Sequence, residues 1–152
     1  MTKRNSELQL AFSTPIWVSI IPNYKEMNEK LYDYIKKLHK NNPDGITKSN
    51  LLGWHSEDFN LESDGPKYFI NSISASLNEA FNDMSWDIVN QEVKITSMWS
   101  IINKKNASNS RHIHSNNYLS AAYYVKAPNN CGDIIFHDPR SVTTFRHPKF
   151  SN

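Results

Sequence analysis

Hydrophobic residues recur at helical spacing twice in the first half of the chain. The first set lies between residues 24 and 40 and comprises Met27, Leu31, Tyr34, Ile35 and Leu38. The second set comprises Phe69, Ile70, Ile73, Leu77, Ala80 and Phe81. Apolar residues three and four positions apart lie on one face of a helix. The pattern therefore predicts two amphipathic helices, the second with Asp64 as N-cap and Pro66 in its first turn.

Other segments have the pattern of extended chain. Residues 8–12 and 16–21 are apolar and are predicted to be extended. Residues 46–65 are polar and predict a long ordered loop, whereas apolar and polar residues alternate over 93–101, which is strand spacing. Helices followed by strands are the order of an α+β domain.

Composition limits the class of protein. With 152 residues, 38% hydrophobic and 12% aromatic, the chain is long enough to form a single domain with a core. Its 17 basic and 15 acidic residues are scattered, so the net charge of +2 gives no footprint for nucleic acid. Cys131 is the only cysteine, and no segment has the length of a membrane span or the pattern of a signal peptide. We therefore expect a cytoplasmic protein with no internal disulfide, membrane partner or nucleic-acid partner.

Two histidines, His112 and His114, are separated by one residue. In an extended segment, side chains at this spacing point to the same side, so two imidazoles can bind one metal ion. An apolar segment, residues 119–125, and a segment led by glycine, residues 132–140, follow and are predicted strands. The alternative is that both histidines are ordinary polar residues where a loop enters a strand.

The order of these motifs resembles the core of the iron(II)- and 2-oxoglutarate-dependent oxygenases, in particular a bacterial and phage group of them. The shared features run over nearly the whole chain. They are Thr-Pro-Ile-Trp at residues 14–17, Ser-Asn-x-x-Gly-Trp-x-Ser at 49–56, His-x-His at 112–114, Leu-Ser-x-x-Tyr-Tyr at 119–124 and Asp-Pro-Arg at 138–140.

The resemblance implies N-terminal helices packed on a jelly-roll, also called a double-stranded β-helix. Residues 1–152 would form one domain, with 1–86 as a helical and loop-rich support and 87–152 as the first part of the jelly-roll. A closed jelly-roll needs about eight strands, and only about four strand signals follow residue 87. We therefore expect an incomplete sheet, as in a chain truncated at the C-terminus or an unusually small domain.

The same resemblance implies that His112 and His114 bind iron(II). His114 stands where the family has a carboxylate, which leaves two alternatives: an all-imidazole site, or a site in which another residue or a water replaces the acid. The family also has a more distal histidine. His137 comes too early for that role, and His147 is ambiguous because it lies so near residue 152.

Two residues are implied to bind the cosubstrate 2-oxoglutarate. Tyr124 falls on the position of a tyrosine that, in the prolyl-hydroxylase branch, donates a hydrogen bond to the distal carboxylate; its alternative role is core packing. Arg140 can pair with a carboxylate through two hydrogen bonds, or can be a solvent-facing turn residue.

Roles in packing are expected for the neighbouring motif residues. Trp54 should anchor its loop on the core, Asn50 and Ser56 should bond to local backbone, and His55 should lie on the surface. Trp99 is expected to pack.

Two functions remain open from the sequence. The first is an iron(II)- and 2-oxoglutarate-dependent dioxygenase that uses dioxygen to hydroxylate a small-molecule or peptide substrate, with little turnover by this chain alone because the distal ligand is missing. The second is a non-catalytic, cupin-like or jelly-roll protein that binds a metal or another ligand. A cupin carries a glutamate shortly after His-x-His, and residues 115–118 contain none. Fold alone does not separate these functions.

Overall fold

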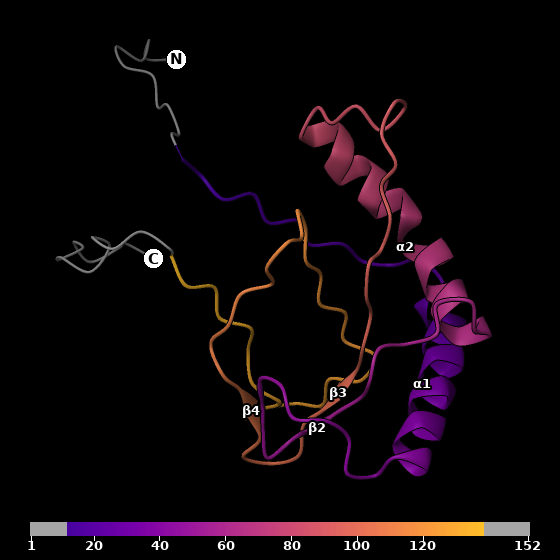
Figure 1. The fold of residues 1–152 in the computed structure, drawn as a ribbon, viewed down its shortest axis with the longest axis vertical. Helices are drawn as coiled ribbons and strands as arrows, with labels where there is room; N and C mark the ends of the chain where they lie inside the picture. The colour runs from indigo at the N-terminus through magenta and orange to yellow at the C-terminus, as the bar shows by residue number, and fades with distance from the viewer. Residues whose placement is uncertain (1–11, 139–152) are drawn as a thin grey trace, which may run out of the picture.

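The computed structural model describes residues 12–138. Two helices and four short strands make up its regular structure: α1 (Tyr24–Asn41), β1 (Asn50–Leu51), β2 (Trp54–His55), α2 (Asp64–Asp83), β3 (Ile101–Ile102) and β4 (Ser108–Asn109). The two helices contact each other along one flank, and the strands lie next to them (Figure 1). This confirms the predicted α+β class. Neither helix of the described part is long and apolar enough to cross a membrane.

Helix α1 confirms the first amphipathic prediction almost to the residue. It begins after Asn23, whose left-handed backbone (φ 55°) suits an asparagine. Met27, Leu31 and Ile35 form its buried face. Charged residues on the outer face form exposed ion pairs, such as Lys30 with Glu26 at 3.1 Å. Pairs of this kind contribute little, so burial of the apolar face is what stabilises α1.

Helix α2 confirms the second helix but not its predicted cap. The N-cap is Ser63, and Asp64 is the first helical residue, so the prediction was wrong by one position. A carboxylate in the first turn is still favourable there because it faces the positive end of the helix dipole. Pro66 lies in the first turn as predicted, and Phe69 and Phe81 are buried.

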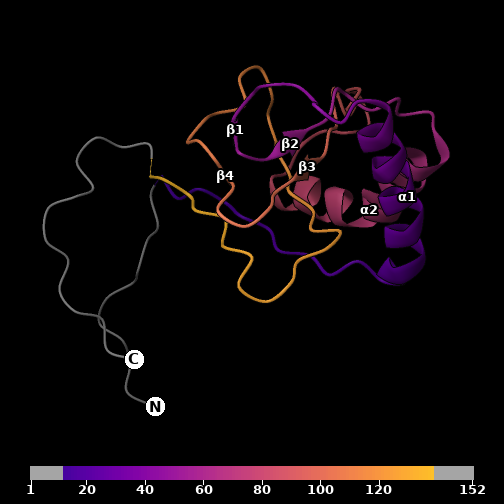
Figure 2. The same cartoon turned by 90° about the horizontal axis from the view of Figure 1, so that it is seen from below.

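The two helices approach closely where α2 begins. A Cβ atom added to Gly65 would lie 2.9 Å from the carbonyl oxygen of Lys30 and 3.0 Å from the Cβ of Tyr34, both on α1. Figure 2 shows α1 crossing over α2 from a second direction. Because a backbone atom is in the way, only glycine fits at this crossing.

The four strands are parts of one interrupted antiparallel ladder, which we call the ribbon. In the ribbon, residues 49–59 run alongside residues 98–110. Strand β1 pairs with β4 (Asn50 opposite Asn109), and β2 pairs with β3 (His55 opposite Ile101). One backbone hydrogen bond extends the pairing at each end of the ribbon. Phe59 N donates to the Met98 carbonyl (2.7 Å), and Ser110 N donates to the Ser49 carbonyl (2.8 Å). Between β3 and β4 the chain makes an extra turn, residues 103–107, closed by a bond from Ala107 N to the Lys104 carbonyl of 3.0 Å.

The core fills the space between the helices and the ribbon. Its buried members are Ile21, Met27, Leu31, Ile35, Trp54, Phe59 and Phe69. Trp54 anchors the ribbon to this core, because its indole N–H donates to the carbonyl of Asn42 at 2.8 Å. The side chain of Ser56 is buried and accepts a hydrogen bond from Ser100 N at 2.9 Å. The predicted packing role of Trp54 is confirmed, and Asn50 bonds to local backbone as predicted, at Lys48 N and the Gly53 carbonyl. The same prediction for Ser56 was wrong, because its partner is 44 residues away.

Several predicted strands are absent from the described residues. Residues 16–21, 119–125 and 132–138 form no ladder there, and regular pairing in the stretch predicted to begin at residue 93 starts only at residue 98. A strand requires a partner to accept and donate its backbone hydrogen bonds, and these segments find none among residues 12–138. The regular pairing of the described part is therefore limited to the two strand pairs of the ribbon, and no jelly-roll is present there. Residues 8–11 of the first predicted strand lie outside the described residues.

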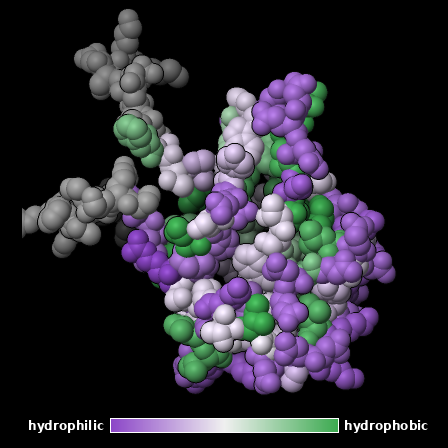
Figure 3. Space-filling view, viewed as in Figure 1, coloured by the Kyte–Doolittle hydropathy of each residue, from purple (hydrophilic) through white to green (hydrophobic). Residues whose placement is uncertain are grey.

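The unpaired segments expose apolar side chains. Val18 and Ile20 are 92% and 90% exposed, and Ile135 is 73% exposed. Figure 3 shows hydrophobic groups separated by hydrophilic ones on the face in view. At the end of the apolar segment 16–21, Ile21 is buried in the core.

Replacing Gly65 by alanine tests the helix crossing. Two effects oppose each other: alanine is favoured over glycine in a helix by about 0.5–1 kcal/mol, whereas overpacking costs about 1–3 kcal/mol. Because the clash is with backbone, we expect Gly65→Ala to lower the free energy of unfolding in urea by about 1 kcal/mol. The control is Asn78→Ala on the exposed face of the same helix, which should leave stability unchanged or slightly raised. A Gly65→Ala protein that is more stable than wild type would contradict the packing described here.

Candidate metal centre

The ribbon ends immediately before the two histidines. Ser110 is its last bonded residue, and both its backbone N–H (2.8 Å) and its hydroxyl (3.3 Å) donate to the carbonyl of Ser49. His112 and His114 follow within four residues, in a segment without regular secondary structure. The backbone at the start of this segment is therefore fixed by the ladder, although both histidines are exposed.

The structure brings the two imidazoles together. The Nε2 atoms of His112 and His114 are 3.0 Å apart, and the rings lie 5.0 Å apart at 23°. Two nitrogens that bind one ion at about 2.1 Å, at a right angle to each other, are separated by about 3 Å. The observed separation therefore fits a shared ion with octahedral geometry.

One of the two rings has its tautomer determined by the backbone. Nδ1 of His112 is 2.7 Å from the carbonyl oxygen of Ser110. A carbonyl only accepts hydrogen bonds, so Nδ1 carries the proton and Nε2 of the neutral ring carries the lone pair. Metal-binding histidines usually have this arrangement, in which the second ring nitrogen donates to a carbonyl or carboxylate. The donor set and the His112 tautomer therefore suit iron(II) or another first-row transition metal. Nε2 of His114 donates to Nε2 of His112 at 3.0 Å, so His114 would give up that proton on binding the same ion.

A third protein ligand is not found in the described part. Within residues 12–138, no group of three or more His, Cys, Asp or Glu side chains is arranged to hold a metal. His137 is exposed and is not brought to the pair. His147 and Arg140 lie outside the described residues. Both alternatives for the place of the family's carboxylate therefore remain.

Trp99 packs against one imidazole of the pair, that of His114. The indole of Trp99 lies 5.4 Å from the ring of His114 and stacks at 5.8 Å on the ring of His55. Trp99 packs, as predicted. His55, however, is only 5% exposed, and the prediction that it lies on the surface was wrong.

Burial of His55 follows from β2 being covered on both faces. Trp54 faces α1, where its ring meets that of His39 at 5.0 Å, and the next side chain points the other way, toward Trp99. Nδ1 of His55 meets its hydrogen-bonding need at the carbonyl of Ser56, 2.6 Å away. Sequence alone gives no signal of this, since a strand covered on two faces loses its alternation of polar and apolar residues.

Of the two adjacent tyrosines, Tyr123 takes the packing role. Its ring lies 5.1 Å from Phe69, its hydroxyl donates to Asn28 Oδ1 at 2.7 Å, and burial raises the pKa of its phenol. The carbonyl of Val125 also bonds to Asn28, at 3.1 Å. Tyr124, between them, is 56% exposed. Core packing, the alternative role considered for Tyr124, thus belongs to its neighbour.

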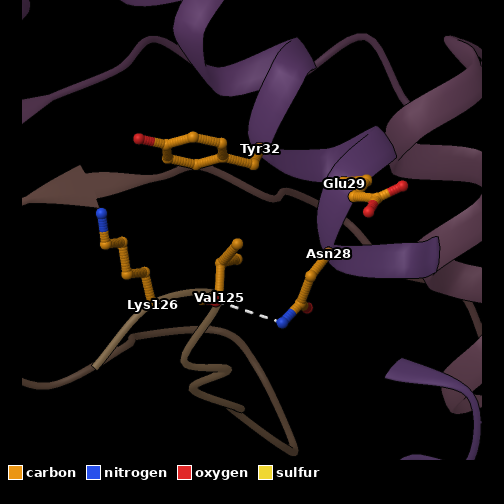
Figure 4. A pocket seen from close by; sticks show the side chains of 5 residues that line it. All are labelled: Asn28, Glu29, Tyr32, Val125 and Lys126. Atoms are coloured by element: carbon orange, nitrogen blue, oxygen red, sulfur yellow. Dashed lines mark hydrogen bonds between the residues drawn. The ribbon is translucent and has the colours of Figure 1, made fainter. Parts of the chain in front are cut away.

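An open, shallow hollow lies between α1 and residues 125–126. Its lining comprises Asn28, Glu29, Tyr32, Val125 and Lys126, and the Asn28 side chain reaches the Val125 carbonyl beside it (Figure 4). Neither imidazole lines this hollow, so it is not part of the candidate metal centre.

Comparison with known proteins gives one result for this part of the chain. Residues 97–152 match a family model described as "Putative 2OG-Fe(II) oxygenase". The resemblance seen in the sequence is confirmed there. The matched segment contains His112, His114, Tyr124 and Arg140, and this family implies iron(II) and 2-oxoglutarate as cofactors. No curated protein and no solved structure matches the chain significantly.

Proposed function

We propose that the protein is an iron(II)- and 2-oxoglutarate-dependent dioxygenase, a hydroxylase, in which His112 and His114 bind the iron. The observation that carries the proposal is the 3.0 Å separation of the two Nε2 atoms, inside the segment that matches the oxygenase family model. The substrate is a small molecule or a peptide, and dioxygen is the co-reactant.

The two histidines have different tasks in this proposal. His112 presents a lone pair at Nε2 because the Ser110 carbonyl holds the proton on Nδ1. His114 occupies the place of the family's carboxylate and adds a second imidazole to the coordination sphere. A further ligand would come from outside residues 12–138 or would be a water.

Bound iron(II) would supply the chemistry of this family, in which dioxygen gives one oxygen atom to 2-oxoglutarate, which becomes succinate and carbon dioxide, and the other to the hydroxylated substrate. The protein's own residues bind and orient the cosubstrate. Tyr124 donates a hydrogen bond from its phenol to the distal carboxylate, and its 56% exposure supports the role by leaving the hydroxyl accessible. Arg140 pairs with a carboxylate of the same molecule.

The proposal also includes the architecture. Residues 87–152 form the first part of a jelly-roll supported by residues 1–86, within one domain. The exposed apolar run of Ile134, Ile135 and Phe136, which has the composition of a strand, supports this arrangement. Strands β3 and β4 join the two parts, because they pair with β2 and β1 of the support region.

A second candidate is a metal-binding protein without oxygenase activity. It is favoured by the two-ligand count among the described residues. The two candidates differ in whether the metal-loaded protein binds 2-oxoglutarate.

Metal binding is the first test. Manganese(II) is a redox-stable substitute for iron(II), and we expect the wild-type protein to bind it in calorimetric titrations, whereas His112→Ala and His114→Ala should each weaken binding at least tenfold through loss of one ligand. His137→Ala is the matched control, since the structure keeps this exposed histidine away from the pair. Equal binding by the wild type and His112→Ala would refute the assignment.

Binding of 2-oxoglutarate is the second test. We expect the manganese-loaded wild type to bind it, and Tyr124→Phe to weaken binding by about 1 kcal/mol, roughly fivefold, the net worth of one hydrogen bond. Tyr123→Phe is the control, because its hydroxyl is already used by Asn28; it should lower stability but leave 2-oxoglutarate binding unchanged. A wild-type protein that binds manganese but not 2-oxoglutarate would support the second candidate instead.

A further inference from the structure

A column of four rings runs from the interior to the candidate metal centre. In order it consists of His55, Trp99, His114 and His112, and we call it the ring column. Successive centroids are 5.8, 5.4 and 5.0 Å apart. Exposure increases along it, from the buried His55 through the half-buried Trp99 to the two exposed imidazoles.

The ribbon determines where the inner end of the column lies. His55 is directly opposite Ile101 in the β2–β3 pair. Trp99 stands two residues before Ile101, so its side chain leaves the ribbon on the same face and is a diagonal neighbour of His55. The hydrogen bond from Ser56 N to the Ser100 carbonyl, 3.0 Å, holds the backbone of both residues in this register.

The outer end of the column is less restrained. His112 has a backbone partner in Ser110. His114 has no backbone partner: its Nε2 bonds to Nε2 of His112 at 3.0 Å, a bond that a shared ion would replace, and its ring rests on Trp99. An exposed imidazole rotates freely unless something restricts its side-chain torsions, and rotation would move Nε2 away from the ion.

We propose that Trp99, held by His55, is a positioning residue that keeps the His114 ring oriented so that its Nε2 points at the shared ion. The inference rests on the proposed metal-binding function and adds a role for two residues that bind neither metal nor cosubstrate. Trp99 acts through the face of its indole, which restricts rotation of His114 by contact and needs no hydrogen bond. A smaller aromatic ring should keep part of this effect, and an aliphatic side chain should not.

Manganese titration of three tryptophan variants tests the proposal. We expect Trp99→Leu to weaken binding about tenfold, the lower end of what loss of an outer-shell contact costs, and Trp99→Phe to remain within about threefold of wild type. Trp17→Leu is the control, because the Trp17 indole bonds to Asp83 on α2, and it should bind as wild type does. Trp99→Leu with wild-type affinity would overturn the inference while His112→Ala still reports on the metal site itself.

A measurement without metal covers the case in which Trp99→Leu does not fold. In the metal-free wild-type protein, nuclear Overhauser effects should connect the Trp99 indole protons with the ring protons of His114. The chemical shifts of the His114 ring protons should also move toward those of a histidine in an unfolded peptide in Trp99→Phe. In Trp17→Leu they should move less. Absence of the nuclear Overhauser effects in the folded wild type, or unchanged His114 resonances in Trp99→Phe, overturns the inference.

Discussion

Antiparallel pairing of residues 49–59 with residues 98–110 connects the helical core to the candidate metal centre. At one end of the ribbon, Phe59 is both a core residue and a backbone partner of Met98. At the other end, Ser49 holds Ser110, two residues before His112. A shift of this register by one residue would exchange the faces of the ribbon and move Trp54 out of the core. The position of the imidazoles in space thus depends on packing at the far end of the same ladder.

The register also explains why polar side chains are buried here. Both faces of β2 are covered, one by α1 and the other by Trp99, so Trp54 and His55 are buried side by side. Two of these groups have a specific partner: the Trp54 indole bonds to Asn42, and His55 bonds to the Ser56 carbonyl. The buried hydroxyl of Ser100 has no partner among the described residues. Buried polar groups with partners cost little and favour one arrangement over others. This makes the ribbon a rigid base for the exposed segment that follows.

The sequence predicted the helices well because their information is local. Residues 24–40 were predicted and Tyr24–Asn41 is observed, and the cap of α2 was wrong by one position. A strand needs a partner that can lie far along the chain, and the local sequence does not show whether one exists. The strand predictions for residues 16–21, 119–125 and 132–138 were therefore wrong for the described part of the chain. The burial of His55 was missed for the same reason, since its cover, Trp99, is 44 residues away.

The sequence alone singled out the two candidate metal ligands, but it did not predict which side chains pack around them. The His-x-His spacing and the order of the motifs pointed to His112 and His114, and the family match covers both. The roles of Tyr123 and Tyr124 could not be separated by spacing, because either residue of the pair can face the core; Asn28 and Phe69 on the helices decide it. The support of His114 by Trp99 likewise arises only from the folded ribbon.

Anomalous diffraction from crystals of the protein grown with manganese(II) tests the central claim most directly, because it locates the ion instead of inferring it from affinity. The account predicts an anomalous peak about 2.1–2.2 Å from Nε2 of both His112 and His114, with the Nδ1 hydrogen bond of His112 to Ser110 retained. A peak bound to other residues, or imidazoles that turn apart with no ion between them, would contradict it.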